Sequence, residues 1–282
     1  MTDPLVYLNG AMTPLSEAKI PVLDRGFIFG DGVYEVIPIY ARKMFRAEHH
    51  MARLLRSLAA IEIANPHTKE QWMGLINQVV KAHPADDQMV YLQVTRGVAK
   101  RGHAFPKEAT TPTVFIMTGP LALPSPEVRA NGVACVSMED KRWLRCDIKS
   151  ISLLGNVLAA QYAAENDAVE SIQFRDGFLS EASASNVWIV RNGTLMGPPK
   201  DNLILEGIRY GLIEELCAAE GIPLEVRRIS RDEVFSADEV LLSSATKEIL
   251  PVTSIDGKRA GSGKPGAIYH KLFNAYQNAK AA

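Results

Sequence analysis

Hydrophobic positions in the first half of the chain follow the two spacings that distinguish helices from strands. In AEHHMARLLRSLAAIEI the apolar residues lie three or four apart, which predicts an amphipathic helix, and a second helix is expected over KEQWMGLINQVVKAH. β-Branched and aromatic residues fill QMVYLQVTRG and TPTVFIMTG, as is typical of strands. LVYLNG followed by PLSEAKIPVL indicates a hairpin, and GVYEVIPIYARKMF indicates a strand pair that turns near Arg42.

Strands and helices also alternate in the second half. Strands are expected at VACVSMED, SIQFRDG, SNVWIVRNG, PLEVRRI and DEVLLSS, and helices at LLGNVLAAQYAAEN, at GIRYGLIEELCAAEG and from Tyr269 onwards. Between the halves, GPLALPSPEVRANG carries three closely spaced prolines, which is typical of a linker. We therefore expect an α+β protein with a small N-terminal domain (residues 1–118), a linker (119–128) and a larger C-terminal domain (129–282).

Composition narrows the choice of partners. The chain has 31 basic and 32 acidic residues and a formal net charge of -1, so no overall field draws it to nucleic acid or an anionic membrane. The start, MTDPLVYLNG, has no basic segment followed by a long apolar one, and we expect no secretory signal. Cys135, Cys146 and Cys217 are widely spaced without CxxC, which favours a reducing cytoplasm. The six histidines lack metal-ligand spacing, so no metal is expected.

Two glycine-rich stretches resemble phosphate loops only in part. GSGKPG (261–266) lacks the GxxxxGK[ST] spacing, which favours a surface turn. RGFIFGDG (25–32) has no GxGxxG between a strand and a helix, and we interpret it as a turn that needs positive φ.

One lysine is a candidate nucleophile. In RCDIKSISLLGNVLAA, Lys149 stands between Ile148 and Ile151, just before an apolar helix. Partial desolvation lowers the pKa of a lysine, as a Schiff-base nucleophile requires. A helix-capping lysine with its ammonium in water is the alternative.

Three weak signals for an anion occur further along. LSEASASNVWIV places Glu181 before small hydroxylated residues, ILEGIRYGLIEEL puts Gly207 at a helix start, and LLSSATKEILPV leaves a strand through Ser243 and Ser244. Each also fits an ordinary turn or helix start. Together with an arginine-bearing helix and the candidate lysine, they suggest a phosphate-bearing aldehyde cofactor.

VTRGVAKRGHAFP places four potential cations within eight residues, which indicates a solvated loop or an anion site. Alternate residues of an extended chain point the same way, so Arg101 and His103 can face one ligand together. We interpret Arg96 and Lys100 as a solvated loop face.

Seven stretches, in order, resemble the fold-type IV pyridoxal-phosphate aminotransferases, and among these the D-amino acid aminotransferases: DRGFIFGDGVYEV, EHHMARLLRS, VYLQVTRGVAKRGHAFP, RWLRCDIKSISLLGNVLA, LSEASASNVW, LEGIRYGLI and LLSSATKEILPV. They cover nearly the whole chain, and RWLRCDIKS and RGHAFP are the most specific. The resemblance implies a two-domain α+β fold, pyridoxal 5'-phosphate as cofactor, and a homodimer in which the RGHAFP loop reaches the neighbouring subunit. The implied substrates are an amino acid and a 2-oxo acid: D-alanine and 2-oxoglutarate would give pyruvate and D-glutamate.

The resemblance also implies roles for single residues. Lys149 would hold the cofactor as a Schiff base and move the proton at the substrate Cα, Glu181 would keep the pyridine nitrogen protonated, and Arg53 would bind the phosphate. The remaining cofactor contacts would come from backbone N–H groups and one side chain against the ring: Ile208, Arg209, Ser244, Ala245 and Leu205. The substrate carboxylate would be bound by Tyr34, Arg101 and His103.

The chain departs from the family's pattern at three positions. Family members often carry threonine where Arg209 and Ala245 stand and serine where Ala184 stands, so hydroxyl donors are lost while backbone donors remain. Branched-chain L-amino acid aminotransferases and aminodeoxychorismate lyases share the fold and are alternatives. Arg101 and His103 favour the D-specific enzymes, and the presence of Lys149 and Glu181 disfavours a non-catalytic protein of this fold.

Overall fold

The computed structural model describes residues 3–281, which divide into two compact units. Unit 1 comprises Met1–Leu121 and Ile148–Leu153, and unit 2 comprises Ala122–Asp147 and Leu154–Ala282. The division differs from the expected one because the short segment around Lys149 returns to unit 1. Both units combine helices with a sheet, which confirms the expected two-domain α+β class.

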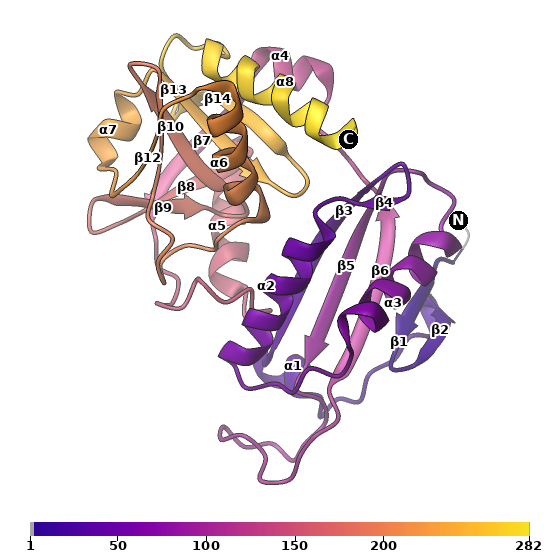
Figure 1. The fold of residues 1–282 in the computed structure, drawn as a ribbon. Coiled ribbons are helices and arrows are strands. Elements are labelled where there is room, and N and C mark those ends of the chain that lie inside the picture. Colours follow the sequence, from indigo (N-terminus) through magenta and orange to yellow (C-terminus); the bar gives the residue numbers. More distant parts are fainter. Residues whose placement is uncertain (1–2, 282) are drawn as a thin grey trace. The chain divides into compact units, whose positions relative to one another are not determined.

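Unit 1 is built on a six-stranded antiparallel sheet in the order β2-β1-β6-β5-β3-β4. Its strands are β1 (Leu5–Leu8), β2 (Ala11–Pro14), β3 (Gly32–Tyr40), β4 (Lys43–Met44), β5 (Gln88–Thr95) and β6 (Thr113–Pro120). Two helices, α2 (Ala47–Ala60) and α3 (Lys69–Ala82), lie on one face of this sheet (Figure 1). The helix and strand predictions for QMVYLQVTRG, TPTVFIMTG and the two helical stretches are confirmed.

The helices of unit 1 bury the residues that their spacing predicts. Met51, Leu54 and Leu58 of α2 are each at most 2% exposed and pack in the core with the inner face of α3. The start of α3 is fixed by a capping box, in which Thr68 and Gln71 each accept a hydrogen bond from the other's backbone N–H.

Two local predictions in unit 1 were wrong. The hairpin partner of β1 is β2, joined through Asn9 and Gly10 with φ of 47° and 99°, whereas PLSEAKIPVL contributes the 3-10 helix η1 (Leu15–Glu17). The turn expected at RGFIFGDG is instead the short helix α1 (Arg25–Phe29), which the Asp24 side chain caps, while the expected positive φ does occur at Gly30, which ends the helix at φ 67°.

The returning segment pairs with the start of β3. Tyr34 N–H donates to the Lys149 carbonyl and Ile151 N–H to the Gly32 carbonyl, both at 3.0 Å, and Ser150 bridges Val33. These bonds fix Lys149 against the strand that carries Tyr34.

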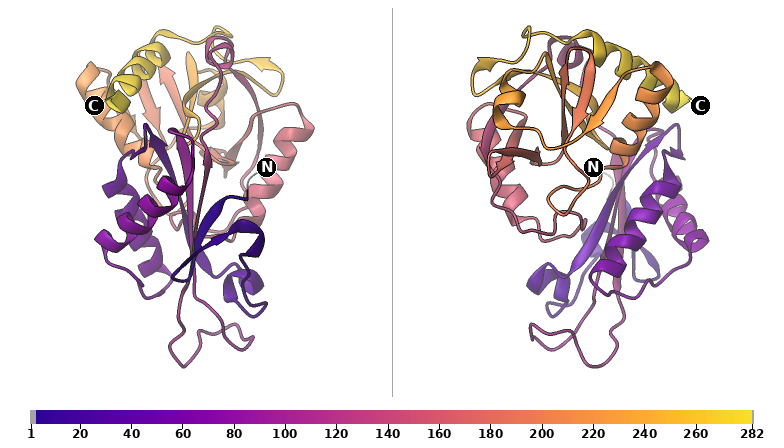
Figure 2. Two further views of the ribbon diagram at one scale, coloured as in Figure 1. Left: turned by 90° about the vertical axis from the view of Figure 1, so that its right-hand side faces the viewer. Right: turned by 60° about the vertical axis from the view of Figure 1, so that its left-hand side comes forward.

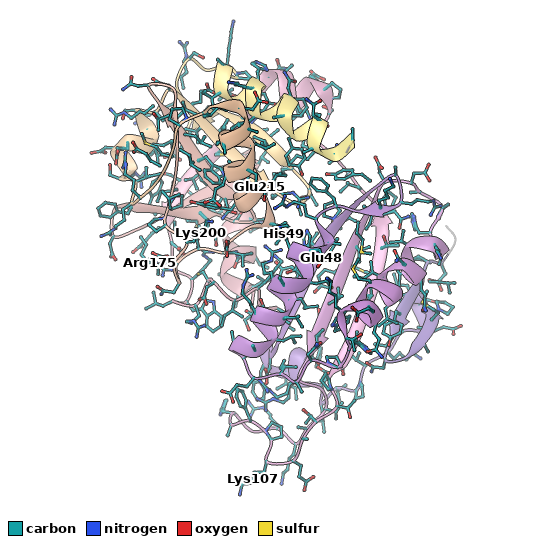
Figure 3. The ribbon with its side chains drawn as sticks, in the orientation of Figure 1. Glu48, His49, Lys107, Arg175, Lys200 and Glu215 are labelled. Atoms are coloured by element: carbon teal, nitrogen blue, oxygen red, sulfur yellow. The ribbon has the colours of Figure 1, made fainter. Side chains whose placement is uncertain are left out.

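The loop between β5 and β6 extends past the end of the sheet in two views (Figures 1 and 2). Lys107 lies near its far end (Figure 3). This is the VTRGVAKRGHAFP loop, so the candidate substrate residues lie on a projecting segment.

Unit 2 contains a nine-stranded mixed sheet in the order β12-β11-β10-β13-β14-β7-β8-β9, with β15 paired to β14. Its strands are β7 (Val133–Glu139), β8 (Glu170–Arg175), β9 (Phe178–Ala182), β10 (Asn186–Arg191), β11 (Thr194–Gly197), β12 (Leu224–Val226), β13 (Glu239–Ser244), β14 (Glu248–Ile255) and β15 (Lys258–Arg259). Its helices are α4 (Pro126–Asn131), α5 (Leu154–Glu165), α6 (Ile208–Glu220), α7 (Arg231–Phe235) and α8 (Ala267–Ala281). Among the helices within residues 3–281, none is long and apolar enough to cross a membrane.

Gly97 at the base of the projecting loop should not tolerate a side chain. Its φ is 90°, and an added Cβ would overlap the Thr111 carbonyl oxygen, whereas Gly10 has φ 99° and nothing within 4 Å of an added Cβ. Gly10→Ala should therefore cost only the backbone strain, roughly 1–2 kcal/mol. Gly97→Ala should cost about 1–3 kcal/mol more from overpacking. Urea unfolding of both variants checks this, and equal losses would contradict the overlap.

Candidate active site

Lys149 and Tyr34 are neighbours in unit 1. The Lys149 Nζ lies 4.0 Å from the centroid of the Tyr34 ring, and both residues are partly buried. The Lys149 N–H donates to the Ser57 hydroxyl at 3.3 Å, and Tyr91 stacks at a tilt 5.7 Å from Tyr34. Burial, with the nearby Tyr34, raises the pKa of Tyr91 to about 12. The Lys149 amine thus lies over the face of the Tyr34 ring, and the Lys149 backbone is held by its hydrogen bond to Ser57.

Arg53 belongs to a buried network that the sequence did not reveal. Its Nε and Nη2 donate to the two Glu35 carboxylate oxygens, each at 2.8 Å, and His50 Nδ1 lies 2.8 Å from the same carboxylate. Burial disfavours the charged carboxylate, but the charge and hydrogen bonds of Arg53, with His50, outweigh it and hold the pKa of Glu35 well below its usual range. The guanidinium fork assigned to a phosphate is directed at Glu35 in this structure.

Arg101 and His103 meet on one aromatic ring. The Arg101 guanidinium carbon lies 5.4 Å from the centroid of the Phe29 ring, and the His103 ring lies 5.5 Å from it. Both residues are exposed. Within residues 3–281, no hydrogen bond or ring contact joins either of them to Tyr34.

The interpretation of Arg96 as a solvated residue was wrong. It is 6% exposed, its Nε and Nη2 donate to Asp31 at 2.8 and 3.0 Å, and its guanidinium lies 3.7 Å from the centroid of Phe105. It also donates to the carbonyls of residues 61 and 62 at the end of α2. The reason is that the base of the loop packs against this helix end, which a local pattern does not report. Lys100 is exposed, as predicted.

Glu181 is the centre of a buried cluster in unit 2. It lies on β9, 6% exposed, and accepts hydrogen bonds from Arg142 and from the Leu205 N–H at 3.1 Å. Arg142 also binds Asp140 at 2.8 Å. Burial raises the pKa of Glu181 and Arg142 opposes this rise, whereas the bonds to Arg142 and Ser180 outweigh burial at Asp140 and lower its pKa to about 2. Arg142 lies inside the specific stretch RWLRCDIKS, although the sequence gave it no role.

Asn186 connects this carboxylate to the start of α6. Its Nδ2 donates to the Leu205 carbonyl at 2.9 Å and to Glu181 at 3.3 Å, and its Oδ1 would overlap a Cβ added to Gly207. Asn186 also pairs in register with Ser243 near the end of β13. The structure therefore brings Glu181, Leu205, the start of α6 and the end of β13 together around one residue.

The start of α6 has the features of an anion site. No side chain caps it at Gly207, the Tyr210 N–H donates to the Gly207 carbonyl at 2.9 Å, and the helix dipole favours an anion at this end. Ser244 Oγ accepts from the Lys247 N–H at 3.1 Å, which leaves the hydroxyl proton of Ser244 to donate. A carboxylate on one side of Asn186 and the N–H groups of a helix start on the other fit a cofactor with a ring nitrogen and a phosphate.

Three side chains near this site are engaged elsewhere. Arg209 is 1% exposed, and its Nε donates to the Tyr276 hydroxyl on α8 at 2.9 Å. Ser183 and Ser185 donate to buried Glu170, which Lys247 also binds at 2.7 Å. The serine hydroxyls that the sequence offered to a phosphate are therefore directed at a carboxylate instead.

The comparisons with known proteins identify an aminotransferase family. Residues 32–255 match the family model described as amino-transferase class IV, and the chain belongs to this family. The fold-type IV resemblance and the enzyme class are confirmed.

Individual relatives show which members of this family the chain is similar to. The chain is 41% identical over 273 residues to a D-alanine aminotransferase of Bacillus licheniformis, covering 97% of this chain and 96% of the relative. It is 36% identical over 280 residues to that of Staphylococcus haemolyticus, covering 98% and 99%. A T.th. branched-chain amino acid aminotransferase solved with pyridoxamine 5'-phosphate has a TM-score of 0.92 at 24% identity, covering 99% and 94% of the two chains, and it shows the fold alone.

Replacing Glu35 should leave the charge of Arg53 poorly compensated in the core. Glu35→Gln should lower the free energy of unfolding at neutral pH by about 3–5 kcal/mol, the usual cost of breaking a buried ion pair. Glu48→Gln is the control, since Glu48 pairs with Lys69 on the exposed side of α2 (Figure 3), where such pairs are worth about 0–1 kcal/mol.

The same variant has a pH signature. The pKa of Glu35 is depressed in the folded state, so its stabilisation is present above the ordinary pKa of 4.5 and is lost as the pH falls below it. The difference between wild type and Glu35→Gln should shrink by about 1.4 kcal/mol per pH unit below that point. Denaturant unfolding at several pH values measures it, and a constant difference would contradict the ion pair.

Proposed function

We propose that the protein is a pyridoxal-phosphate-dependent D-amino acid aminotransferase. It would take the amino group of D-alanine and other D-amino acids and transfer it to 2-oxoglutarate, forming pyruvate and D-glutamate. The observation that carries the choice of donor is the placement of Arg101 and His103 on one ring, in a chain whose full-length relatives are D-alanine aminotransferases.

Bound pyridoxal phosphate would supply an electron sink for the carbanion at the substrate Cα. Lys149 would supply the amine that holds the cofactor, and the same amine would then move the proton at the substrate Cα. Glu181 would accept a hydrogen bond from the protonated pyridine nitrogen and so keep the proton on that nitrogen. The charge of Arg142 next to Glu181 supports this role, because it opposes the effect of burial on the carboxylate.

The phosphate would be bound mainly by backbone N–H groups. The first turn of α6 offers those of Ile208 and Arg209, and the turn after β13 offers those of Ser244 and Ala245, with the dipole of α6 favouring the anion. Leu205 would pack against the ring. Arg53 would add its charge from α2, with Glu35 fixing the orientation of the guanidinium.

The substrate carboxylate would be bound by Arg101, His103 and Tyr34. Arg101 offers a planar fork, and His103 and Tyr34 each add a single donor. A lysine on one side of the substrate reaches only one position of the Cα hydrogen. The side on which the carboxylate is held therefore selects the D enantiomer.

We also propose a cytoplasmic homodimer in which the loop of Arg101 and His103 serves the neighbouring subunit. The exposed apolar side chains of α5 support an interface: Leu154, Val157, Leu158 and Tyr162. The three cysteines are buried and free, which supports the reducing compartment.

Lys149→Ala should lose transamination and the visible absorbance of the bound cofactor while the protein stays folded. The amine is the group that moves the proton, and such groups contribute roughly 10²–10⁴-fold to rate. Lys141→Ala, at a lysine that is 76% exposed, is the control and should behave as wild type. Wild-type turnover by Lys149→Ala without added amine would show that another residue carries the chemistry.

Arg101→Ala should raise the KM for D-alanine by an amount equivalent to about 2–5 kcal/mol, the usual penalty for truncating a desolvated charge pair. The absorbance of bound cofactor should persist, and an amine donor without a carboxylate should be spared. Steady-state kinetics on both donors measure this, and equal losses on the two would assign the carboxylate contact elsewhere.

Co-expression of Arg101→Ala with Lys149→Ala tests the shared site. If the loop serves the neighbouring subunit, a mixed dimer has one intact site, and about a quarter of the wild-type activity should return at low D-alanine, because half of randomly assorted dimers are mixed. No recovery, or an active monomer in sedimentation, would refute the arrangement.

A further inference from the structure

Arg25 is a buried arginine of α1 whose side chain ends on the backbone of the substrate-binding loop. It is 3% exposed, and its Nη1 donates to the Gly102 carbonyl at 2.6 Å and its Nη2 to the His103 carbonyl at 3.3 Å. We propose that Arg25 is a positioning residue that sets the direction of Arg101 and His103 and so controls affinity for the substrate carboxylate. This inference rests on the proposed function of those two residues.

The guanidinium of Arg25 is itself fixed. Its Nε donates to Asp31 Oδ2 at 2.7 Å, and the same carboxylate also accepts hydrogen bonds from Nε and Nη2 of Arg96. Burial disfavours the charge of Asp31, but the bonds to both arginines outweigh it and lower its pKa, so Asp31 holds them as a charged acceptor. Two loop carbonyls are therefore held by a donor that has little freedom to move.

The backbone of α1 adds a second connection to the loop. The Arg25 N–H donates to the Gly97 carbonyl at 2.9 Å, and Asp24 bridges Val98. A Cβ on Gly26 would overlap the side chain of Thr95 at the end of β5, so α1 lies directly against the strand from which the loop departs. Arg25 thus binds the base of the loop through its backbone and the middle of the loop through its side chain.

Phe29, one turn further along α1, contacts the side chains of Arg101 and His103. The Arg25 guanidinium lies 4.9 Å from the Phe29 centroid, on the ring that Arg101 and His103 also contact. Fixing the carbonyls at 102 and 103 fixes the peptide planes on either side of His103. The direction of His103 is therefore set by one buried side chain, and Arg101, one residue before the held Gly102 carbonyl, contacts the same ring.

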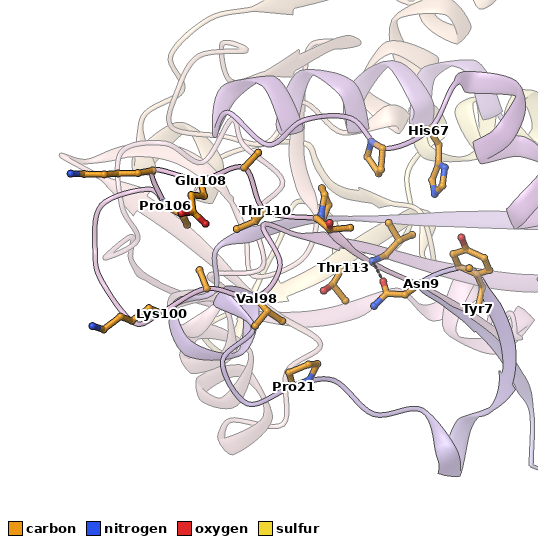
Figure 4. Close-up of a pocket in the computed structure, with 18 residues that line it drawn as sticks. Tyr7, Asn9, Pro21, His67, Val98, Lys100, Pro106, Glu108, Thr110 and Thr113 are labelled. Atoms are coloured by element: carbon orange, nitrogen blue, oxygen red, sulfur yellow. Dashed lines mark hydrogen bonds between the residues drawn. The ribbon is translucent and has the colours of Figure 1, made fainter.

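On the other side of the loop, no residue within 3–281 gives Arg101 and His103 comparable support. There the loop arches over a cavity of about 960 Å³, lined by Val98, Lys100, Pro106 and Thr110 and by Tyr7 and Asn9 of the first hairpin (Figure 4). Neither Arg101 nor His103 lines this cavity. Positioning of the two residues consequently depends on the side of the loop that faces Arg25.

Arg25→Met and Arg25→Lys, each as the full-length enzyme with its cofactor, test the proposal. The KM for D-alanine should rise roughly 10- to 100-fold in Arg25→Met, the range expected for losing hydrogen bonds from a charged donor. Its kcat should change far less, the absorbance of bound cofactor should persist, and the amides of residues 101–106 should exchange hydrogen faster. Arg25→Lys keeps a charge for Asp31 but not the fork, and its KM should be intermediate.

Arg42→Met is the matched control. Arg42 likewise binds an aspartate, Asp86, and the carbonyls of residue 80 in α3 and of residues 83 and 84 after it, but it lies beyond the opposite end of β3. The KM of the Arg42→Met variant for D-alanine should equal that of wild type. Any loss of stability in this variant shows the effect of removing an arginine whose hydrogen bonds are purely structural.

The outcomes separate the two proposals. An unchanged KM in Arg25→Lys and Arg25→Met alongside a raised KM in Arg101→Ala would overturn the role of Arg25 alone. An unchanged KM in Arg101→Ala would overturn the carboxylate assignment and the positioning role together. Arg25→Lys keeps the charge pair with Asp31. If it nevertheless shows a lower kcat, a lower cofactor absorbance and a higher KM together, Arg25 would have only a structural role. If Arg25→Met fails to fold, the intermediate KM expected of Arg25→Lys decides the question.

Discussion

A carboxylate taken out of water must be met by cations or N–H donors, and four wholly or partly buried carboxylates organise the two units in this way. Each joins segments that are distant in sequence: Asp31, Glu35, Glu170 and Glu181. Asp31 is the example with the widest reach, because its two arginines hold the end of α2 and the middle of the projecting loop. On the proposed roles, a residue with no assigned chemistry would thereby help to determine where the substrate-binding side chains lie.

Much of the fold follows from spacing alone. The inward residues of α2 recur three and four apart, and β5 and β6 are filled with β-branched and aromatic residues, so both the elements and their buried faces could be predicted. The short helix α1 could not, because five residues show no period and its existence depends on the Asp24 cap and on contact with Thr95. Return of Lys149 to unit 1 also depends on pairing with β3, which no local pattern reports.

Some residues of the candidate site could likewise be predicted from the sequence, and others could not. Lys149, Glu181 and the α6 start stand in stretches whose composition suggested chemistry, whereas Arg142 and Asn186 became visible only through their contacts with Glu181. Arg96 shows most clearly what a local pattern cannot predict. A cation beside a glycine suggests a solvated loop, but Arg96 donates to backbone carbonyls at the end of α2, a contact distant in sequence. Sequence patterns report which groups are available, and long-range contacts decide which of them are free to bind a ligand.

The handedness of the product tests the proposed function most directly. The enzyme would be given D-alanine, L-alanine, D-leucine or L-leucine as donor with 2-oxoglutarate as acceptor, and the glutamate formed would be separated by chiral chromatography. The proposed function predicts pyruvate and D-glutamate from D-alanine and no transfer from either L donor. Formation of L-glutamate from L-leucine, with D-alanine inert, would contradict it and identify a branched-chain L-amino acid aminotransferase.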